Sequence, residues 1–294
     1  MNKLKRQIQK KIDAWPHRPI FIAMDGAQFD NLPNLLRKNK IFFKSLFLDR
    51  KPGSVGRSGP FLATIAPHQG EFFLSLPDVL NGSVFWNAQC SFDTFYRHLR
   101  TLSLVRIPSQ SEEKSKTRMV VFRHFDPKTI ALILPIMTLP QRARFFGPAQ
   151  SLLISVPEGV LEAKRRSNWP EPEKGFLSFD QEKMNLITDA MKLRSHHKIA
   201  KFLRDTAPDQ TKDMNDEALL KFVERSEEES KIFEVTTEAG KGRFAWLQLM
   251  SHEKFSKDPA IITYMKSVRH DPDLGLKHLI SMTSKVHMEK NKQS

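Results

Sequence analysis

Short apolar runs alternate with helical patterns along the first half of the chain. Residues 20–24 form an apolar run that ends at Asp25-Gly26, which is typical of a buried strand followed by a turn. Residues 31–38 instead repeat leucine at helical spacing. Further apolar runs predict strands at residues 45–48, 61–65, 119–125 and 151–156. We therefore predict that the first half folds as a mixed sheet with interleaved helices.

The clearest helical pattern of this half spans Phe92–Leu102. Its apolar side chains recur three and four positions apart and form one stripe, and Ser91 stands where an N-cap is expected. Arg97 and Arg100 fall largely outside the stripe. Further along, Asp126-Pro127 predicts a second helix start, because Asp caps a helix and Pro loses no hydrogen bond at its first position.

Strand patterns fade after residue 156. Residues 157–175 hold several prolines and a basic run, and we interpret them as a linker. Beyond them the spacing is helical at residues 180–207, 215–223, 243–250, 259–268 and 274–282. The predicted fold is α+β, with an N-terminal mixed α/β sheet domain at 1–156, the linker at 157–175, a C-terminal helical lobe at 176–284 and a polar tail at 285–294.

Composition excludes several classes of protein. The chain has 294 residues and one cysteine, Cys90, so it forms no internal disulfide and no multi-cysteine zinc site. The basic N-terminus lacks the apolar core of a signal peptide, and no stretch reaches the roughly 18 apolar residues that cross a bilayer. We expect a cytoplasmic protein with no membrane partner.

The formal net charge of +14 is concentrated in the first half. Residues 1–150 hold 23 basic and 10 acidic side chains, whereas residues 151–294 hold 24 and 23. The N-terminal run Lys3–Lys11 is most simply the solvated face of a helix that carries Leu4, Ile8 and Ile12 on its other side. A basic lobe attracts nucleic acid, anionic lipid or an acidic protein surface, and charge alone does not choose among them.

The sequence shows none of the common catalytic motifs that we looked for. The sequence contains no Gly-rich phosphate loop and no Gly-x-Ser-x-Gly elbow. Asp25 with Asp126 is a conceivable carboxylate pair, but both positions fit a turn and a cap. His196-His197 point about 100° apart on a helix, and His98 with His124 lack a third ligand. We predict no catalytic residue, no metal site and no cofactor.

Arg97, Arg100, Arg123 and Asp126 allow two interpretations. One is a structural network in which arginine forks bind carboxylates and tie a helix to the sheet. The other is a basic recognition face for a partner's carboxylates or backbone. Because arginine beside a capping aspartate is ordinary, we favour the structural interpretation and keep the second open.

Six short motifs in order resemble the type VI secretion system effector chaperone/adaptor family, known as the domain-of-unknown-function 4123 family. They are Phe21–Ala27, Leu46–Leu48 with Gly59–Leu62, Trp86, Phe95–Arg100, Val121–Pro127 and Phe145–Pro148. Within them, the positions that we expect to maintain the fold are Asp25, Gly26, Gly59, Pro60, Asp126, Pro127 and Gly147. The loop at 51–58 and the insert at 109–116 are more basic than the resemblance leads us to expect, which leaves the partner preference open.

The resemblance implies a non-enzymatic chaperone/adaptor of a bacterial type VI secretion system. Such proteins bind one cognate toxic effector in the cytosol and help to load it onto the spike protein VgrG. We expect a cleft bordered by residues 92–102 to hold the effector, with contacts from Trp86, Tyr96, Arg97, Arg100 and Arg123. The alternative is a basic nucleic-acid-binding protein, although no nucleic-acid-reading motif accompanies the charge.

Overall fold

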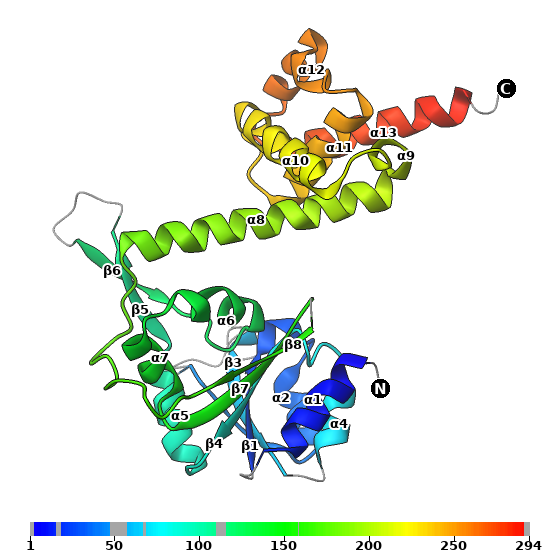
Figure 1. Ribbon diagram of the computed structural model, residues 1–294. Coiled ribbons are helices and arrows are strands. Elements are labelled where there is room, and N and C mark those ends of the chain that lie inside the picture. The colour runs from blue at the N-terminus through cyan, green and yellow to red at the C-terminus, as the bar shows by residue number, and fades with distance from the viewer. Residues whose placement is uncertain are drawn as a thin grey trace. The chain divides into compact units, whose positions relative to one another are not determined.

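The computed structural model describes residues 3–15, 19–47, 58–66, 69–109, 116–157 and 159–290, with side chains to residue 282. The chain divides into two compact units, Met1–Ile187 (unit 1) and Thr188–Ser294 (unit 2) (Figure 1). An antiparallel sheet with helices is followed by a helical region, which confirms the predicted fold class. Most of segments 51–58 and 109–116 lies outside the described residues, as do residues 291–294 of the predicted tail.

Unit 1 contains a six-stranded sheet in the order β2-β3-β1-β4-β7-β8, and every neighbouring pair is antiparallel. Its strands are β1 (Ile20–Asp25), β2 (Phe42–Ser45), β3 (Pro60–Ile65), β4 (Ser83–Ala88), β7 (Ala149–Val156) and β8 (Gly159–Lys164). Strands β1 and β4 are buried along their whole length, whereas β2 and β8 form the two edges. A separate hairpin consists of β5 (Leu104–Pro108) and β6 (Thr117–Val121).

Helices cover both faces of this sheet (Figure 1). One face packs against α1 (Lys3–Asp13), α2 (Leu32–Lys38) and α4 (Gly70–Ser75). The other packs against α5 (Phe92–Thr101), α6 (Pro127–Ile133), η3 (Leu134–Ile136) and α7 (Leu139–Phe146). Alternation along β1 supplies both cores, since Phe21 and Ala23 face α5 while Ile22 and Met24 face α1.

The predicted linker at 157–175 contains a strand of the sheet. Residues Gly159–Lys164 form β8, which pairs with β7 from Val156↔Gly159 to Ser151↔Lys164. Beyond β8, the backbone of Arg106 in β5 bonds Leu177 and Phe179, and both of these side chains are buried in unit 1. The structure therefore places the end of the N-terminal unit at residue 187 rather than 156, because pairing with β7 and β5 holds the intervening chain.

Unit 2 is helical. Its elements are α8 (Gln181–Thr206, which begins in unit 1), α9 (Pro208–Thr211), α10 (Asp216–Ser230), η4 (Lys231–Phe233), α11 (Glu238–Met250), η5 (Phe255–Lys257), α12 (Pro259–Ser267) and α13 (Pro272–Lys290). The backbone of residues 285–290, predicted as tail, belongs to α13. Asn215 and Asp258 cap α10 and α12 as their sequence positions suggest. Among the described residues, no helix has the length and apolar content needed to cross a membrane.

Candidate partner-binding surface

Helix α5 carries three of the five residues predicted to bind a partner. Its first turn is fixed by Ser91, whose side chain accepts a hydrogen bond from the backbone N–H of Thr94 at 3.2 Å. The apolar stripe turns inward, so Phe95 and Leu99 are fully buried. Tyr96 flanks this stripe and is half-buried, as is Arg100, whereas Arg97 is exposed.

Tyr96 joins this helix to the edge of the sheet. Its hydroxyl donates a 2.8 Å hydrogen bond to the backbone carbonyl of Ser45, the last residue of β2. The guanidinium carbon of Arg100 lies 5.6 Å from the centre of the Tyr96 ring, within the range of a cation–π contact. The hydroxyl of Tyr96 is therefore fixed by Ser45, and its ring in turn positions the guanidinium of Arg100.

Strand β2 contributes residues that the sequence did not suggest. Lys44 lies 5.7 Å from the Phe92 ring centre and 5.5 Å from that of Tyr96, and its Nζ contacts Oδ1 of Asp93 at 2.7 Å. This hydrogen bond, together with the charge of Lys44, lowers the pKa of Asp93. Phe42, 55% exposed, packs edge-on against Phe92.

We call this cluster the basic-aromatic surface. Its members come from β2 and α5 and combine three aromatic rings with three cations; they are Phe42, Lys44, Phe92, Tyr96, Arg97 and Arg100. A sequence signal for β2 existed in the apolar pair at 42–43, but the prediction placed the strand at 45–48. Pairing with β3, from Phe42↔Thr64 to Ser45↔Phe61, fixes the strand where it is.

Arg123 has a structural partner. Its guanidinium forms an ion pair with the buried carboxylate of Asp25 at the end of β1. The other oxygen of Asp25 accepts from the N–H of Ala27 at 3.2 Å, and the N–H of Gly26 donates to the carbonyl of Gly59 at 3.1 Å. Arg123 thus has the structural role that we favoured from the sequence, but the carboxylate that it binds is Asp25 and not Asp126.

The motif Gly59-Pro60 lies beside this junction. Pro60 begins β3 and is the register partner of Asp25, and both Gly59 and Pro60 are buried. These contacts tie the ends of β1 and β3 to the turn that carries Arg123.

Asp126 caps α6. One carboxylate oxygen accepts from the backbone N–H of Lys128 and the other from the hydroxyl of Thr129, both at 3.0 Å, and Pro127 occupies the first helical position. Asp25 and Asp126 are thus each engaged in local structure. The sequence suggested these two as a carboxylate pair, but Asp25 stabilises a turn and Asp126 caps a helix.

Trp86 is a core residue rather than a contact for a partner. Its side chain is 0% exposed in the middle of β4, between the rings of Phe95, Phe145 and Phe146, with centroid distances of 5.4 to 6.0 Å. The prediction that Trp86 binds the effector is therefore corrected, because no partner reaches a side chain enclosed by three aromatic rings.

Gly147 allows the chain to pass close to His98. Its φ of +52° lies in the region that favours glycine, and a Cβ there would stand 2.2 Å from Cε1 of His98. Nε2 of His98 lies 3.0 Å from the carbonyl oxygen of Phe145. The Phe145–Pro148 motif therefore has a steric reason for its glycine.

Histidines and carboxylates do not gather into a metal site in the part of the chain that the structure describes. His196 is bonded to Glu227 within unit 2, while the adjacent His197 is exposed. The two therefore face different surroundings, as their helical spacing requires.

The fold and this surface define a two-unit α+β protein in which a mixed basic and aromatic surface lies at one sheet edge. Residues 20–144 match the model of a family described as "Domain of unknown function (DUF4123)". The match begins with β1 and ends inside α7, and it supports the predicted family for this part of the chain. Neither a curated protein nor a solved structure matches the chain.

Proposed function

We propose that this protein is a non-enzymatic chaperone/adaptor that binds a cognate type VI secretion effector in the bacterial cytoplasm and helps to load it onto the VgrG spike. The family match over residues 20–144 supports the proposal, together with the resemblance of the ordered motifs. The observation that carries it is the basic-aromatic surface, which offers a partner cations and rings on two adjoining elements.

This surface has the character of a protein-binding site. Tyrosine and arginine dominate the residues that carry binding energy in protein interfaces. Tyr96 is fixed by its bond to Ser45, and Arg100 and Lys44 are held near its ring, so binding costs little further ordering of these side chains. Asp93 pairs with Lys44 and also feels the charge of Arg97. Three cations against this one carboxylate leave a net positive charge that attracts carboxylates of an incoming segment.

Replacing both arginines by glutamate tests the proposal. We expect R97E/R100E to abolish co-purification of the effector and VgrG from the native bacterium, because the charge of the surface reverses while the buried side of α5 is unchanged. The measurement is affinity purification of the tagged full-length protein followed by mass spectrometry, with the thermal transition recorded for each variant.

A matched control is K38E/K40E, which makes the same change in net charge at two exposed positions. Lys38 is the last residue of α2, the helix that packs against the opposite face of the sheet, and Lys40 follows it. This control should retain the effector. Retention by R97E/R100E would remove the basic-aromatic surface as the site. A wild-type protein that is isolated without an effector and turns over a small molecule would contradict the function itself.

A second candidate function is binding of single-stranded nucleic acid. The same surface supports it, since bases stack on aromatic rings while cations follow the phosphates. It predicts that the purified protein retains nucleic acid in low salt and releases it steeply as salt rises. An absorbance ratio typical of pure protein in low salt would eliminate this candidate.

A further inference from the structure

Strand β8 leaves one side of its backbone open. The strand closes the sheet at the edge opposite β2 and pairs with β7 alone in the described sheet. The N–H of Arg165 donates to the carbonyl of Gln150 at 2.8 Å, which fixes the alternation of the ladder. Leu161 and Ala163 therefore bond β7, whereas the backbone groups of Val160, Glu162 and Lys164 point outward.

Those outward groups are available to another strand. Among the described residues, no backbone hydrogen bond links Val160, Glu162 or Lys164 to a segment beyond β7. An extended polypeptide adds readily to such a row of donors and acceptors, and its side chains then alternate between the two faces of the sheet.

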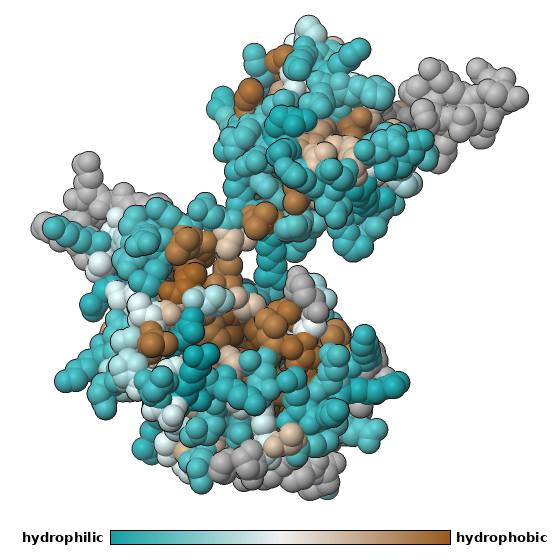
Figure 2. Space-filling model, in the orientation of Figure 1, coloured by the Kyte–Doolittle hydropathy of each residue, from teal (hydrophilic) through white to brown (hydrophobic). Residues whose placement is uncertain are grey.

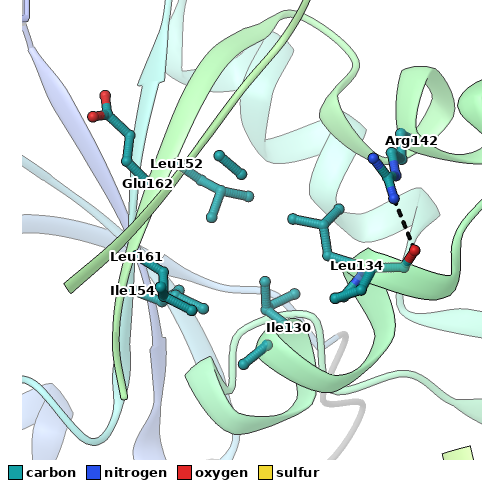
Figure 3. A pocket seen from close by; sticks show the side chains of 10 residues that line it. Ile130, Leu134, Arg142, Leu152, Ile154, Leu161 and Glu162 are labelled. Atoms are coloured by element: carbon teal, nitrogen blue, oxygen red, sulfur yellow. Dashed lines mark hydrogen bonds between the residues drawn. The ribbon is translucent and has the colours of Figure 1, made fainter. Parts of the chain in front are cut away.

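One face beside β8 is an apolar groove of about 280 Å³ (Figure 3). Leu161 and Ala163 of β8 form one side of it; the rest comes mainly from Ile130, Ala131, Leu134, Pro135, Leu152 and Ile154. Leu161 is 50% exposed, and hydrophobic residues gather over α6 and β8 on the surface of unit 1 (Figure 2).

The polar groups at the rim of this groove are already engaged. Arg142 donates to the carbonyl of Pro135 at 2.8 Å, and the carboxylate of Glu162 points away from the apolar side chains (Figure 3). The groove therefore suits apolar side chains.

The other face beside β8 is basic. A hollow of about 690 Å³ lies between β8 and α1, and Lys10, Lys11, Trp15 and Lys164 line it. Glu162 contacts Lys11 at 2.9 Å and Lys164 at 3.5 Å. Burial raises the pKa of Glu162, but these contacts outweigh burial, so that its pKa is lowered. Three lysines against one carboxylate leave a net positive charge facing any added strand.

We propose that the free edge of β8 binds an extended segment of a partner protein whose apolar side chains alternate with polar and acidic ones. The apolar side chains enter the groove beside Leu161, and the carboxylates lie opposite Val160 and Lys164, within reach of the lysines of α1. Opposite Glu162 a neutral residue fits, since a like charge there is repelled. The inference rests on the proposed function in one respect, namely that the ligand is a polypeptide.

A competing explanation for the charged residues Glu162 and Lys164 on β8 is that they prevent the open edge from pairing with other chains. Proteins do place charged residues on exposed edge strands to prevent aggregation. On β8 these charges occupy the α1 face alone, and the groove face presents half-exposed Leu161 without a charge beside it on the strand. An edge with one basic and one apolar face suits a ligand with the complementary alternation.

The test uses the full-length protein and a labelled, capped peptide, Val-Glu-Val-Thr-Val-Glu-Val-Thr, in a fluorescence anisotropy titration. Two control peptides accompany it: one has lysine in place of each glutamate, and the other has the same composition with all valines first. We expect the alternating acidic peptide to bind about tenfold or more tightly than either control. No binding, or equal binding of all three peptides, overturns the inference.

Two variants locate the site. V160P removes one outward N–H and leaves the bonds to β7 intact, since proline is tolerated on the open side of an edge strand. L161E places a charge in the apolar groove at a half-exposed position. Each should weaken peptide binding about tenfold or more, while the thermal transition shows that unit 1 stays folded. Peptide binding that survives L161E, in which folding is least at risk, contradicts the inference.

The same titration separates this inference from the proposed function. R97E/R100E should bind the peptide as the wild type does, because its changes lie on α5 near β2, the opposite edge of the sheet. Loss of the effector in R97E/R100E without any peptide binding by the wild type would sink the β8 inference alone. Peptide binding that depends on Leu161, in a protein that captures no effector or VgrG, would sink the proposed function alone.

Discussion

His124 is fully buried beside His98 in the aromatic core of unit 1. Neither of its ring nitrogens forms a hydrogen bond with another described residue. Burial and the charge of His98 lower the pKa of His124 to about 3. Burial also lowers the pKa of His98 to about 4, although the bond to the Phe145 carbonyl opposes it. Both rings are therefore neutral in the folded protein at neutral pH.

This neutrality makes unit 1 sensitive to mild acid. The unfolded chain binds protons at both histidines below about pH 6.5, whereas the folded chain binds them only near pH 4 and 3. Stability is thus fully present above pH 6.5 and is lost as pH falls toward the folded pKa values. Each histidine contributes a slope of about 1.4 kcal/mol per pH unit in this window.

His124→Leu should reduce that loss. Between pH 7.5 and 5 the free energy of unfolding of unit 1 should fall by about 2 kcal/mol less than in the wild type, because one of the two proton-binding differences is gone. Chemical denaturation at the two pH values measures the difference. The exposed His197→Leu serves as control. An unchanged pH dependence in His124→Leu would show that His124 is protonated normally in the folded protein.

Helix caps give the elements their most local stabilisation. Asp126 satisfies the N–H of Lys128 and the hydroxyl of Thr129 at the start of α6, and Asp258 does the same for the N–H groups of Ala260 and Ile261 in α12. Both are followed by proline at the first helical position. Such starts are written in a few adjacent residues.

Asp126→Ala should lower the free energy of unfolding of unit 1 by about 1 kcal/mol, since two hydrogen bonds to the carboxylate are lost. Asp126→Asn keeps an acceptor for the N–H of Lys128 and should cost clearly less. Urea denaturation of both variants provides the comparison. Equal stability of Asp126→Ala and the wild type would mean that packing of α6 alone determines where the helix begins.

Elements with local signals were predicted closely. The structure places α5 at Phe92–Thr101 with Ser91 as its cap, against a prediction of Phe92–Leu102. The sequence of β8 predicts a linker, because it is short, follows Pro157 and includes Gly159. It forms a strand because it pairs with β7, and sequence periodicity does not record that pairing. Edge strand β2 was displaced for the same reason, since β3 sets its register.

The candidate surface was predictable to the same extent. Tyr96, Arg97 and Arg100 share one helix, so helical spacing was sufficient to group them. Phe42 and Lys44 come from a strand about fifty residues earlier in the chain. Tertiary contacts bring them to α5, namely the bond from Tyr96 to Ser45, the ion pair of Lys44 with Asp93 and the packing of Phe42 on Phe92, and helical spacing records none of these. Trp86 belongs to the same motif series, yet its strand is central and buried, which the motif does not reveal.

At the scale of the whole molecule, each unit has its own core. In unit 2, two apolar clusters adjoin a buried ionic group in which Glu227 bonds His196 and Lys241. Burial raises the pKa of Glu227, but the hydrogen bonds and charges of Lys241 and His196 outweigh it and lower the pKa overall. The stabilisation is therefore present above the ordinary carboxylate pKa and is lost as pH falls through the lowered one.

Glu227→Gln should destabilise unit 2 by roughly 3 kcal/mol, because it leaves Lys241 without its charged partner in a largely buried position. The transition of unit 1 should not move. Differential scanning calorimetry resolves the two, and Glu228→Gln, one residue away and exposed, is the matched control. A single transition that shifts as a whole in Glu227→Gln would show that the units unfold together.

The end of the family match at residue 144 falls inside α7 and before two strands of the main sheet. A chain truncated at that point would lack β7, the neighbour of central strand β4. Strand β4 would then become an exposed edge strand that is prone to pair with another copy of the chain. It would also lose Leu177 and Phe179, which seal the hairpin of β5 and β6. The family match at residues 20–144 is thus shorter than the compact N-terminal unit, and a truncated form of that unit needs to extend at least to residue 179.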